Sequence, residues 1–237
     1  MLLDRAFDSP ESKRRHNRAL FSTIADRYDL ITALLSYGQD ARWKAKLVAL
    51  AAVQSGERTL DLASGTGDIA FAAAARGARV TGLDLTHRML QLAQQRQGTA
   101  PVHFITGDMC ELPVTSASFD LVTTGYGLRN VPDLNRAIDE IARVLKPGGR
   151  LLSLDFNRPE NPIVRGVYLS YLTVVGSTLG WVLHRDPDTY RYIPASIQRY
   201  PGAGGVADRL AARGFDQITV IPLLFGLMTL HIATRSR

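Results

Sequence analysis

The residues best suited to chemistry lie in a glycine-rich loop and at an acidic position after it. Residues 60–68 read LDLASGTGD, and the stretch GTGDIA fits the pattern G-x-G-x-x-A, in which Gly65 and Gly67 let the backbone approach a ligand closely. Asp84 follows Gly67 by 17 residues and ends the next expected strand. A carboxylate there can accept hydrogen bonds from both hydroxyls of a ribose. The pattern therefore indicates an adenosine-containing cofactor, either a dinucleotide or another compound.

Two carboxylates beside this loop distinguish between the cofactors. Asp61 ends the expected strand before the loop, and Asp68 begins the expected helix after it. A dinucleotide places its pyrophosphate against such a helix N-terminus, where Asp68 would repel it. S-adenosylmethionine carries an ammonium and a sulfonium but no phosphate, so the same carboxylates attract it. The charges therefore favour S-adenosylmethionine over a nicotinamide dinucleotide.

A third acidic position follows the third expected strand, in the segment ITGDMCELP. The carboxylate of Asp108 can accept a hydrogen bond from an adenine amino group, with Met109 packing against the ring. The alternative is that Asp108 is an exposed turn residue without a ligand.

Short apolar runs alternate with amphipathic stretches from residue 59 onward, after a helical region that Gly38 is expected to divide in two. Strands are expected at residues 59–63, 79–84, 102–106, 119–124, 150–156, 215–221 and 227–234, and helices at 68–76, 86–97, 134–145 and 206–213. The alternation predicts a parallel sheet with helices on both faces, closed by an antiparallel hairpin at one edge. The predicted fold class is α/β, a Rossmann-like, doubly wound, seven-stranded sheet with an antiparallel last strand, N-terminal helices and a helical lid.

The domain organisation follows from changes in composition. Residues 1–20 are polar and rich in Lys and Arg, so we expect a solvated arm there in preference to a dedicated binding patch. Residues 21–237 are expected to form a single domain, with a cofactor-binding half at 57–157, a helical lid at 158–202, and a terminal helix and strand hairpin at 203–237. The uncharged run 166–183 reaches the lower limit of a membrane span, but half of it is Gly, Ser, Thr and Tyr. We expect a helix pair there, either buried or forming a lid over an apolar substrate.

Composition excludes several other classes. The chain has 237 residues, of which 46% are hydrophobic and 21% charged, so it is an ordinary globular sequence. The net charge of +6 suits nucleic acid or an anionic lipid leaflet, but no stacking aromatic motif is interleaved with the basic residues, so we expect no nucleic-acid partner. A single cysteine, Cys110, allows no intrachain disulfide and indicates a reducing compartment. The histidines show no metal-ligand spacing, so no metal is predicted.

Five segments of the chain form a distinctive set: YDLITALLSYGQDARWK at 28–44, DLASGTGD at 61–68, FDLVTTGYGLRNV at 119–131, RVLKPGGRLL at 143–152 and DPDTYRYIPASIQRYP at 186–201. Together they resemble the class I S-adenosylmethionine-dependent methyltransferases, and more closely the ubiquinone/menaquinone biosynthesis C-methyltransferase family. They follow one another in the order of the family, from about residue 21 to the C-terminus. The glycine loop is shared by all class I enzymes, whereas the GLRNV and DTYRY motifs are much narrower.

The resemblance implies S-adenosylmethionine as the cofactor, with contacts on Thr66, Asp84, Asp108 and Met109. A further family position, commonly serine, falls on Gly125 here, so a side-chain contact is missing at that place.

The chain also departs from the family at positions expected near the substrate. Ile31 and Thr32 stand where Met-Asn is usual, Asp40 stands where a histidine is expected, and residues 155–157 read Asp-Phe-Asn where Glu-x-Ser is favoured. These departures leave open whether the acceptor is a naphthoquinol or a benzoquinol, but they do not affect the methyl donor.

The reaction implied by the resemblance moves a methyl group from sulfur to a ring carbon of a polyprenyl quinol. That carbon is a weak nucleophile until a neighbouring hydroxyl loses its proton, and a phenol-like pKa is about 10. Arg129 is the first candidate to stabilise the developing phenolate, and Asn130 to orient a hydroxyl. The proton acceptor stays open, with a water as one candidate. Further candidates on the substrate side are Tyr28, Tyr126, Tyr190 and Arg191.

Each assignment has a plainer alternative. Tyr28 fits a helix core, and Arg191 fits a surface ion pair. Competing functions are methylation of another small apolar ring, an RNA-binding methyltransferase, and an idle scaffold that only binds the cofactor. The expected location is cytoplasmic, with peripheral binding at the inner face of the membrane as an extension, and a homodimer is compatible with the sequence.

Overall fold

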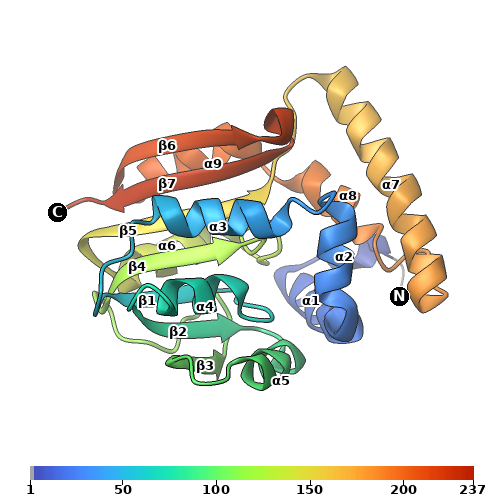
Figure 1. The fold of residues 1–237 in the computed structure, drawn as a ribbon. Coiled ribbons are helices and arrows are strands. Elements are labelled where there is room, and N and C mark those ends of the chain that lie inside the picture. The colour runs from blue at the N-terminus through green and yellow to red at the C-terminus, as the bar shows by residue number, and fades with distance from the viewer. Residues whose placement is uncertain (1–2) are drawn as a thin grey trace.

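The computed structural model describes residues 3–237. A seven-stranded sheet forms its centre, in the order β3-β2-β1-β4-β5-β7-β6 (Figure 1). The strands are β1 Arg58–Leu62, β2 Arg79–Asp84, β3 Val102–Thr106, β4 Phe119–Gly125, β5 Leu145–Phe156, β6 Phe215–Leu223 and β7 Met228–Arg235. The first five pair in parallel, and β7 pairs antiparallel with both β5 and β6. The predicted fold class is confirmed.

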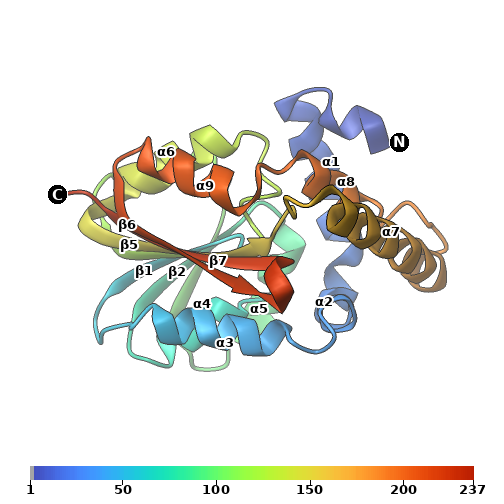
Figure 2. The same cartoon turned by 90° about the horizontal axis from the view of Figure 1, so that it is seen from above.

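Helices cover both faces of this sheet, and four more lie beyond the ends of its strands (Figure 2). One face carries α3 Asp40–Leu50, α4 Asp68–Ala74 and α5 His87–Arg96, and the opposite face carries α6 Leu134–Val144 and α9 Gly202–Ala211. Beyond the carboxyl ends of the parallel strands lie α1 Pro10–Ile24, α2 Tyr28–Leu35, α7 Pro162–His184 and α8 Tyr192–Arg199. Short 3-10 turns occupy Leu3–Phe7, Ala25–Arg27 and Leu224–Gly226.

The expected hydrophobic patterning explains the layers. Leu60, Leu62 and Val122 are fully buried and belong to the core that includes α6, while Leu121, Leu152 and Leu154 belong to the core that includes α3. Because successive side chains of a strand point to opposite faces, these strands are apolar on both faces, as a doubly covered sheet requires.

The region after β5 differs from the sequence prediction. A helix pair was expected within residues 166–183, but α7 runs without interruption from Pro162 to His184. Asn161 caps its start, because its side chain accepts from the backbone N–H groups of Ile163 and Val164 at 2.9 and 3.2 Å. The glycines of this helix allow close packing and do not break it, since a Cβ on Gly176 would lie 3.2 Å from the Cβ of Tyr190.

Residues 10–20 also differ from the prediction of a solvated arm. They form most of α1, whose start is capped by Ser9 and preset by Pro10 at the first helical position. Asn17 is buried, and Lys13 is half-buried, although Arg15 and Arg18 are exposed. The polar composition of the segment concealed a helix that packs through polar contacts.

Candidate active site

The glycine loop occupies the turn between β1 and α4. Ala63, Gly65 and Gly67 all have positive φ angles, of 52°, 53° and 93°. A Cβ on Gly67 would lie 2.6 Å from a ring carbon of Phe71, so only glycine fits there. The loop therefore turns sharply at the carboxyl end of β1 and leaves its backbone open to a ligand.

Asp84 is fixed at the carboxyl end of β2. Its Oδ2 accepts a hydrogen bond from the Gly65 amide at 2.9 Å, and its Oδ1 accepts from the Thr86 amide at 2.8 Å. Burial raises the pKa of this carboxyl, while the two amides partly oppose that rise. Each oxygen keeps a further lone pair, so the carboxylate can accept from two adjacent hydroxyls.

A cavity opens in front of Asp84. Its volume is about 670 Å³, counting the space open to solvent at its mouth, and Ala63, Leu83 and Met89 contribute its apolar walls. The structure brings five predicted cofactor residues together in its lining: Gly65, Asp84, Asp108, Met109 and Gly125. Three others do not line it, namely Asp61, Thr66 and Gly67.

The lining fits an adenosine-containing ligand. Asn130 contributes a buried side-chain oxygen, Oδ1, that has no hydrogen-bond partner within residues 3–237. Gly127 packs tightly in this lining without a side chain, because a Cβ there would lie 2.3 Å from Thr124 Oγ1 and 3.0 Å from Met109 Cε. The cavity thus combines acceptors for hydroxyl and amine groups with flat apolar surfaces for a ring.

The surroundings of Asp61 and Asp68 differ from those expected from the sequence. Asp68 pairs with Lys44 at 2.9 Å and with Arg96 at 2.7 Å. Burial alone would raise the pKa of Asp68, but these two cations outweigh it and lower that pKa. Asp61 is buried and accepts from Thr123 Oγ1 at 2.7 Å, and burial raises its pKa to about 7. Neither carboxylate lines the cavity, because Asp68 is paired with two cations and Asp61 is bonded to Thr123, so the two free charges assumed from the sequence are not found beside the loop.

Thr66 faces away from the cavity toward α2. Its Oγ1 donates to Asp29 Oδ1 at 2.8 Å, and Arg96 donates to its backbone oxygen at 3.1 Å. These contacts fasten the glycine loop to α2 and α5.

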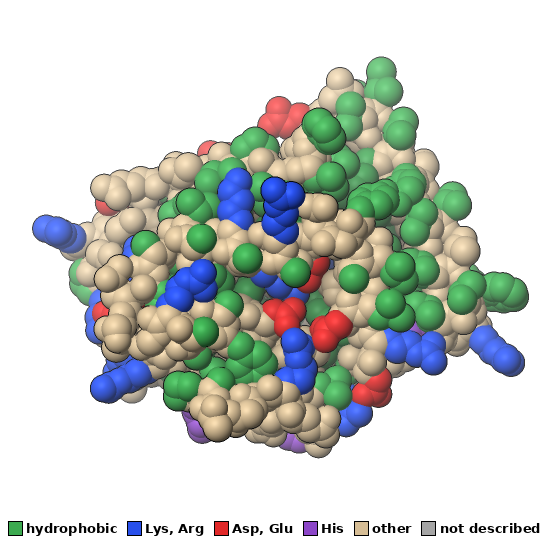
Figure 3. All heavy atoms as spheres, viewed as in Figure 1, with side chains coloured by type: hydrophobic (Ala, Val, Ile, Leu, Met, Phe, Trp, Pro, Cys, Tyr) green, Lys and Arg blue, Asp and Glu red, His purple; other side chains and the backbone are tan. Residues whose placement is uncertain are grey.

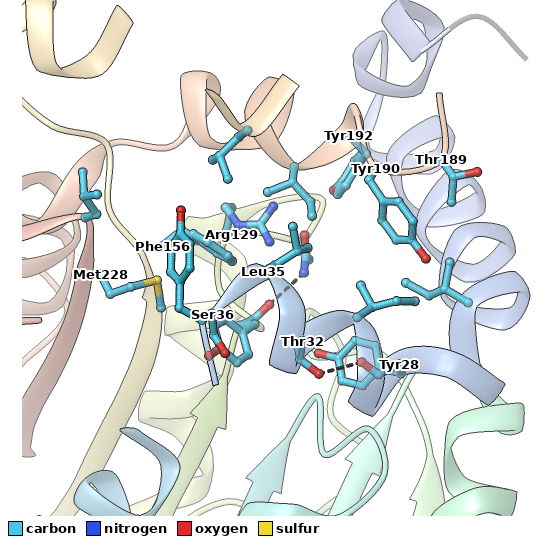
Figure 4. A pocket seen from close by; sticks show the side chains of 18 of the residues that line it. Tyr28, Thr32, Leu35, Ser36, Arg129, Phe156, Thr189, Tyr190, Tyr192 and Met228 are labelled. Carbon is cyan, nitrogen blue, oxygen red and sulfur yellow. Dashed lines mark hydrogen bonds between the residues drawn. The ribbon is translucent and has the colours of Figure 1, made fainter. Parts of the chain in front are cut away.

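A second, largely apolar cavity lies beside the first (Figure 4). Its volume is about 940 Å³, counting the space open to solvent at its mouth. Five of the predicted residues line it, namely Tyr28, Tyr126, Arg129, Asn130 and Tyr190. Figure 4 shows Arg129 reaching in above Phe156, with Tyr190 and Tyr28 on the other side. Most of the remaining lining is contributed by α1, α2, α7, α8 and the β6–β7 turn, with Trp43 of α3, Phe156 of β5 and Met228 of β7.

Arg129 is the one strong cation in this apolar lining. It is 5% exposed, and its Nε lies 3.4 Å from Asp155 Oδ1. Its Nη1 donates to Ser196, and its guanidinium carbon lies 5.0 Å from the centre of the Phe156 ring. Burial raises the pKa of Asp155, although Arg129 opposes this. The pair fixes a positive charge at the wall of an apolar cavity.

Tyr190 and Arg191 are adjacent in sequence but differ in placement. The Tyr190 ring is buried, and its hydroxyl lies 2.8 Å from His184 Nε2. Arg191 is exposed and pairs with Asp188 at 2.8 Å, outside both cavities. Arg191 therefore forms a surface ion pair, which is the alternative considered from the sequence.

The two cavities share a wall. Phe21, Tyr28, Tyr126 and Asn130 line both of them. Ligands in the two cavities would therefore be separated by these four residues alone.

Sequence reasoning missed the contribution of α1. Asn17 lines the cofactor cavity, and Phe21 lines both. Lys13 Nζ donates to the backbone oxygens of Arg129 and Val131 at 3.1 and 2.7 Å, so it holds the loop that carries Arg129. The capping sequence Ser9-Pro10 was the signal that could have revealed this helix.

The sheet order, the antiparallel final hairpin and the adenosine cavity at the carboxyl edge define the class of protein, an S-adenosylmethionine-dependent methyltransferase of the Rossmann-like type. Solved structures agree with this fold. A SAM-dependent methyltransferase from Thermotoga maritima superposes with a TM-score of 0.67 at 18% identity, covering 92% of this chain and 99% of that one. One from Mesorhizobium loti gives a TM-score of 0.60 at 20% identity, covering 82% and 98%.

The chain belongs to the ubiE/COQ5 methyltransferase family, whose model matches residues 9–235. It is 38% identical to the ubiquinone/menaquinone biosynthesis C-methyltransferase UbiE of Rubrivivax gelatinosus, covering 97% of this chain and 90% of that protein. It is also 39% identical to the demethylmenaquinone methyltransferase of Thermobifida fusca, covering 92% and 94%. The resemblance inferred from the five motifs is confirmed.

Proposed function

We propose that this chain transfers a methyl group from S-adenosylmethionine to a ring carbon of a polyprenyl quinol in menaquinone or ubiquinone biosynthesis. The names of its relatives support a quinone precursor as the acceptor. The observation that carries the proposal is the shared wall between the two cavities, one suited to adenosine and one apolar. Two reactants, one in each cavity, would lie next to each other at Tyr28 and Tyr126.

The cavity residues can supply positioning and charge stabilisation. The bound donor supplies an electrophilic methyl group on a sulfonium. Positioning alone provides a large part of such catalysis, since effective molarities of about 10⁵–10⁸ M are reached by well-oriented pairs. Arg129 would stabilise negative charge on the ring oxygen, and Asn130 would orient a hydroxyl through its free Oδ1. Asp84, Asp108 and Met109 would hold the adenosine.

The experiment that tests the function is methyl transfer by the purified protein to a panel of reduced acceptors. We expect label from the methyl donor to appear on demethylnaphthoquinols or demethylated benzoquinols that carry a prenyl chain. Transfer only to soluble, tail-less rings would contradict the proposal, and so would donor binding without transfer to any quinol.

The outer face of α7 supports a membrane-bound acceptor. This helix is the one among residues 3–237 that is long and apolar enough to cross a membrane, and 22% of its most apolar window is buried. Its inner face lines the apolar cavity with Tyr168, Tyr171 and Leu172, so the helix is part of the domain. Hydrophobic side chains also gather on its outer surface (Figure 3). The most exposed are Ile163, Val167, Val174, Trp181 and Val182. Phe225, in the turn between β6 and β7, is also fully exposed.

We infer that this face rests on an anionic lipid surface. Arg185 is exposed just after the same helix, and contact of such a residue with an anionic headgroup contributes about 1 kcal/mol. Arg165, on the helix itself, is half-buried and donates to the backbone oxygen of Pro159 at 3.3 Å. A polyprenyl tail could then pass from the bilayer into the apolar cavity without crossing water. A homodimer stays a prediction, which light scattering in solution would check.

Vesicle binding tests this arrangement. We expect more protein to co-sediment with vesicles that contain phosphatidylglycerol than with neutral ones, and the Trp181→Ser/Val174→Ser variant to bind both less. A variant with two exposed serines changed elsewhere, Ser116→Ala/Ser55→Ala, serves as the control. Equal binding to both vesicle types at low salt would contradict electrostatic docking.

A further inference from the structure

Tyr126 holds an unusual place in the shared wall. It directly follows β4 and has a φ of 61°, a backbone conformation that costs a non-glycine residue energy. Its amide donates to Leu154 O at 2.7 Å, and its side chain is 8% exposed. The strained backbone directs its ring to the boundary between the two cavities.

The hydroxyl of Tyr126 is bonded to a buried carboxylate. Its Oη donates to Asp40 Oδ1 at 2.6 Å. The other carboxylate oxygen of Asp40 lies 2.7 Å from Lys44 Nζ, and its backbone amide donates to Ser36 Oγ at 3.1 Å. Lys44 in turn bridges to Asp68 on α4 at 2.9 Å. Asp40 is thus held in one position by Tyr126, Lys44 and Ser36.

This hydrogen bond determines how Tyr126 can interact with a substrate. Because its only hydroxyl hydrogen is directed at Asp40, the phenolic oxygen can act only as an acceptor toward the cavity. Burial and the charge of Asp40 raise the pKa of Tyr126 well above its ordinary value, so the side chain stays protonated. It can accept a proton from a substrate only if it passes its own to Asp40 in the same step.

We propose that Tyr126 and Asp40 form a proton relay that deprotonates the ring hydroxyl next to the methylated carbon. This inference rests on the proposed function and names its proton acceptor. The hydroxyl proton moves to Tyr126 Oη, and the former Tyr126 proton moves to Asp40 Oδ1. The oxygen electron pair shifts into the ring, whose carbon bonds to the methyl carbon, while the carbon–sulfur bond breaks with its electrons left on sulfur. The ring carbon then loses its hydrogen as a proton, and the oxygen regains one, so one proton is released in total.

The neighbouring groups leave this role to Asp40. Arg129 is permanently protonated and cannot accept a proton, and the amide of Asn130 is not basic. Asp155 is occupied by Arg129 and by two backbone amides, and Asp84 lies in the cofactor cavity. Asp40 stands where the family resemblance expects a histidine, a side chain that can also accept a proton.

The test compares two carboxylates that share Lys44. Asp40→Asn keeps an oxygen that can accept from Tyr126 but cannot take up its proton, so we expect kcat to fall about 100-fold with little change in KM or in donor affinity. The kcat of Tyr126→Phe should fall by the same factor, and the kcat of the double variant should be no lower than that of either single variant. Asp68→Asn removes the other partner of Lys44 without touching the relay, and should lose less than about fivefold.

The pH dependence separates catalysis from packing. Without a base, the variant depends on the ionised fraction of the quinol, so its rate should rise about tenfold per pH unit between pH 7 and 9, whereas the wild type stays nearly level. The charged and titratable groups facing Asp40 are Lys44, Tyr126, Tyr28 and, through Lys44, Asp68. Asp40→His should recover more of the rate than Asp40→Asn.

The possible failures are distinguishable. Two outcomes would overturn the relay and leave the proposed function intact, provided that the wild type methylates a quinol. In the first, Asp40→Asn keeps the wild-type rate. In the second, Asp40→Asn and Asp68→Asn lose the same amount of activity and both keep the flat pH profile of the wild type. A wild type that binds the donor and methylates no quinol overturns the proposed function, and the relay with it. Tyr126→Phe keeps the test decisive if the Asp40 variants fail to fold.

Discussion

Replacing Arg129 with methionine is expected to lower kcat about 1,000-fold and to destabilise the fold at the same time. Removing one preorganised donor to a developing oxyanion costs about 10²–10³ in kcat, and here a full positive charge is lost. Methionine fills much of the same volume, so the apolar cavity keeps its shape. The measurement is the rate of methyl transfer to a prenylated quinol at saturating donor.

The stability loss has a separate cause. Asp155 is 1% exposed, and without Arg129 its pKa rises further, so it is left either as an unpaired buried charge or as a group that must take up a proton. Breaking a buried pair in this way costs about 3–5 kcal/mol. Adding Asp155→Asn removes that charge, so the double variant should regain much of its unfolding free energy in urea without regaining activity. Recovery of activity in the double variant would mean that Arg129 serves the structure and not the chemistry.

Replacing Asp84 with alanine is expected to weaken binding of S-adenosylmethionine by about 1–3 kcal/mol, or about 5- to 150-fold in Kd. The variant loses the acceptor for the ribose hydroxyls and leaves the Gly65 and Thr86 amides without their partner. Calorimetry measures the change directly. Asp120→Ala is a matched control, since Asp120 also accepts from a backbone amide, that of Arg58 at 3.0 Å, but lies outside the cavities.

The same carboxylate gives donor binding a pH dependence. Because burial raises the pKa of Asp84, its protonation begins at a higher pH than that of a free aspartate. A protonated carboxyl loses acceptor capacity, so affinity should be full above that pKa and decline as the pH falls through it. Unchanged affinity of Asp84→Ala, or a flat pH profile in the wild type, would contradict the assignment to the ribose.

Local patterns predicted the sheet well because each strand carries its own signal. The apolar runs at 79–84 and 102–106 match β2 and β3 residue for residue. β5 begins at Leu145 rather than at residue 150, because its ladder with β4 starts at the pair Phe119 and Leu145 before the glycine turn. Backbone pairing across strands is a tertiary property that residue types alone do not record.

The site was predictable where one motif fixes it and not where distant segments meet. Asp84 and Met109 share a cavity because parallel strands end at one edge, which the strand order implies. The pairing of Asp68 with Lys44 and Arg96 joins α3, α4 and α5, so the free charge assumed from the loop is not free. The bond from Tyr126 to Asp40 spans 86 residues, and no local spacing indicates it.

The final strand has a practical consequence for anyone who wishes to label this protein. Since β7 runs antiparallel to β5, Thr234 pairs with Arg150, and the chain leaves the sheet on the side far from α2 and α7 (Figure 1). A fluorophore or affinity handle fused there would lie away from both cavities and would point away from an adsorbed bilayer. A fusion ahead of α1 would instead sit near the helix that walls both cavities, so a C-terminal attachment is the one to choose for tethered or imaging assays.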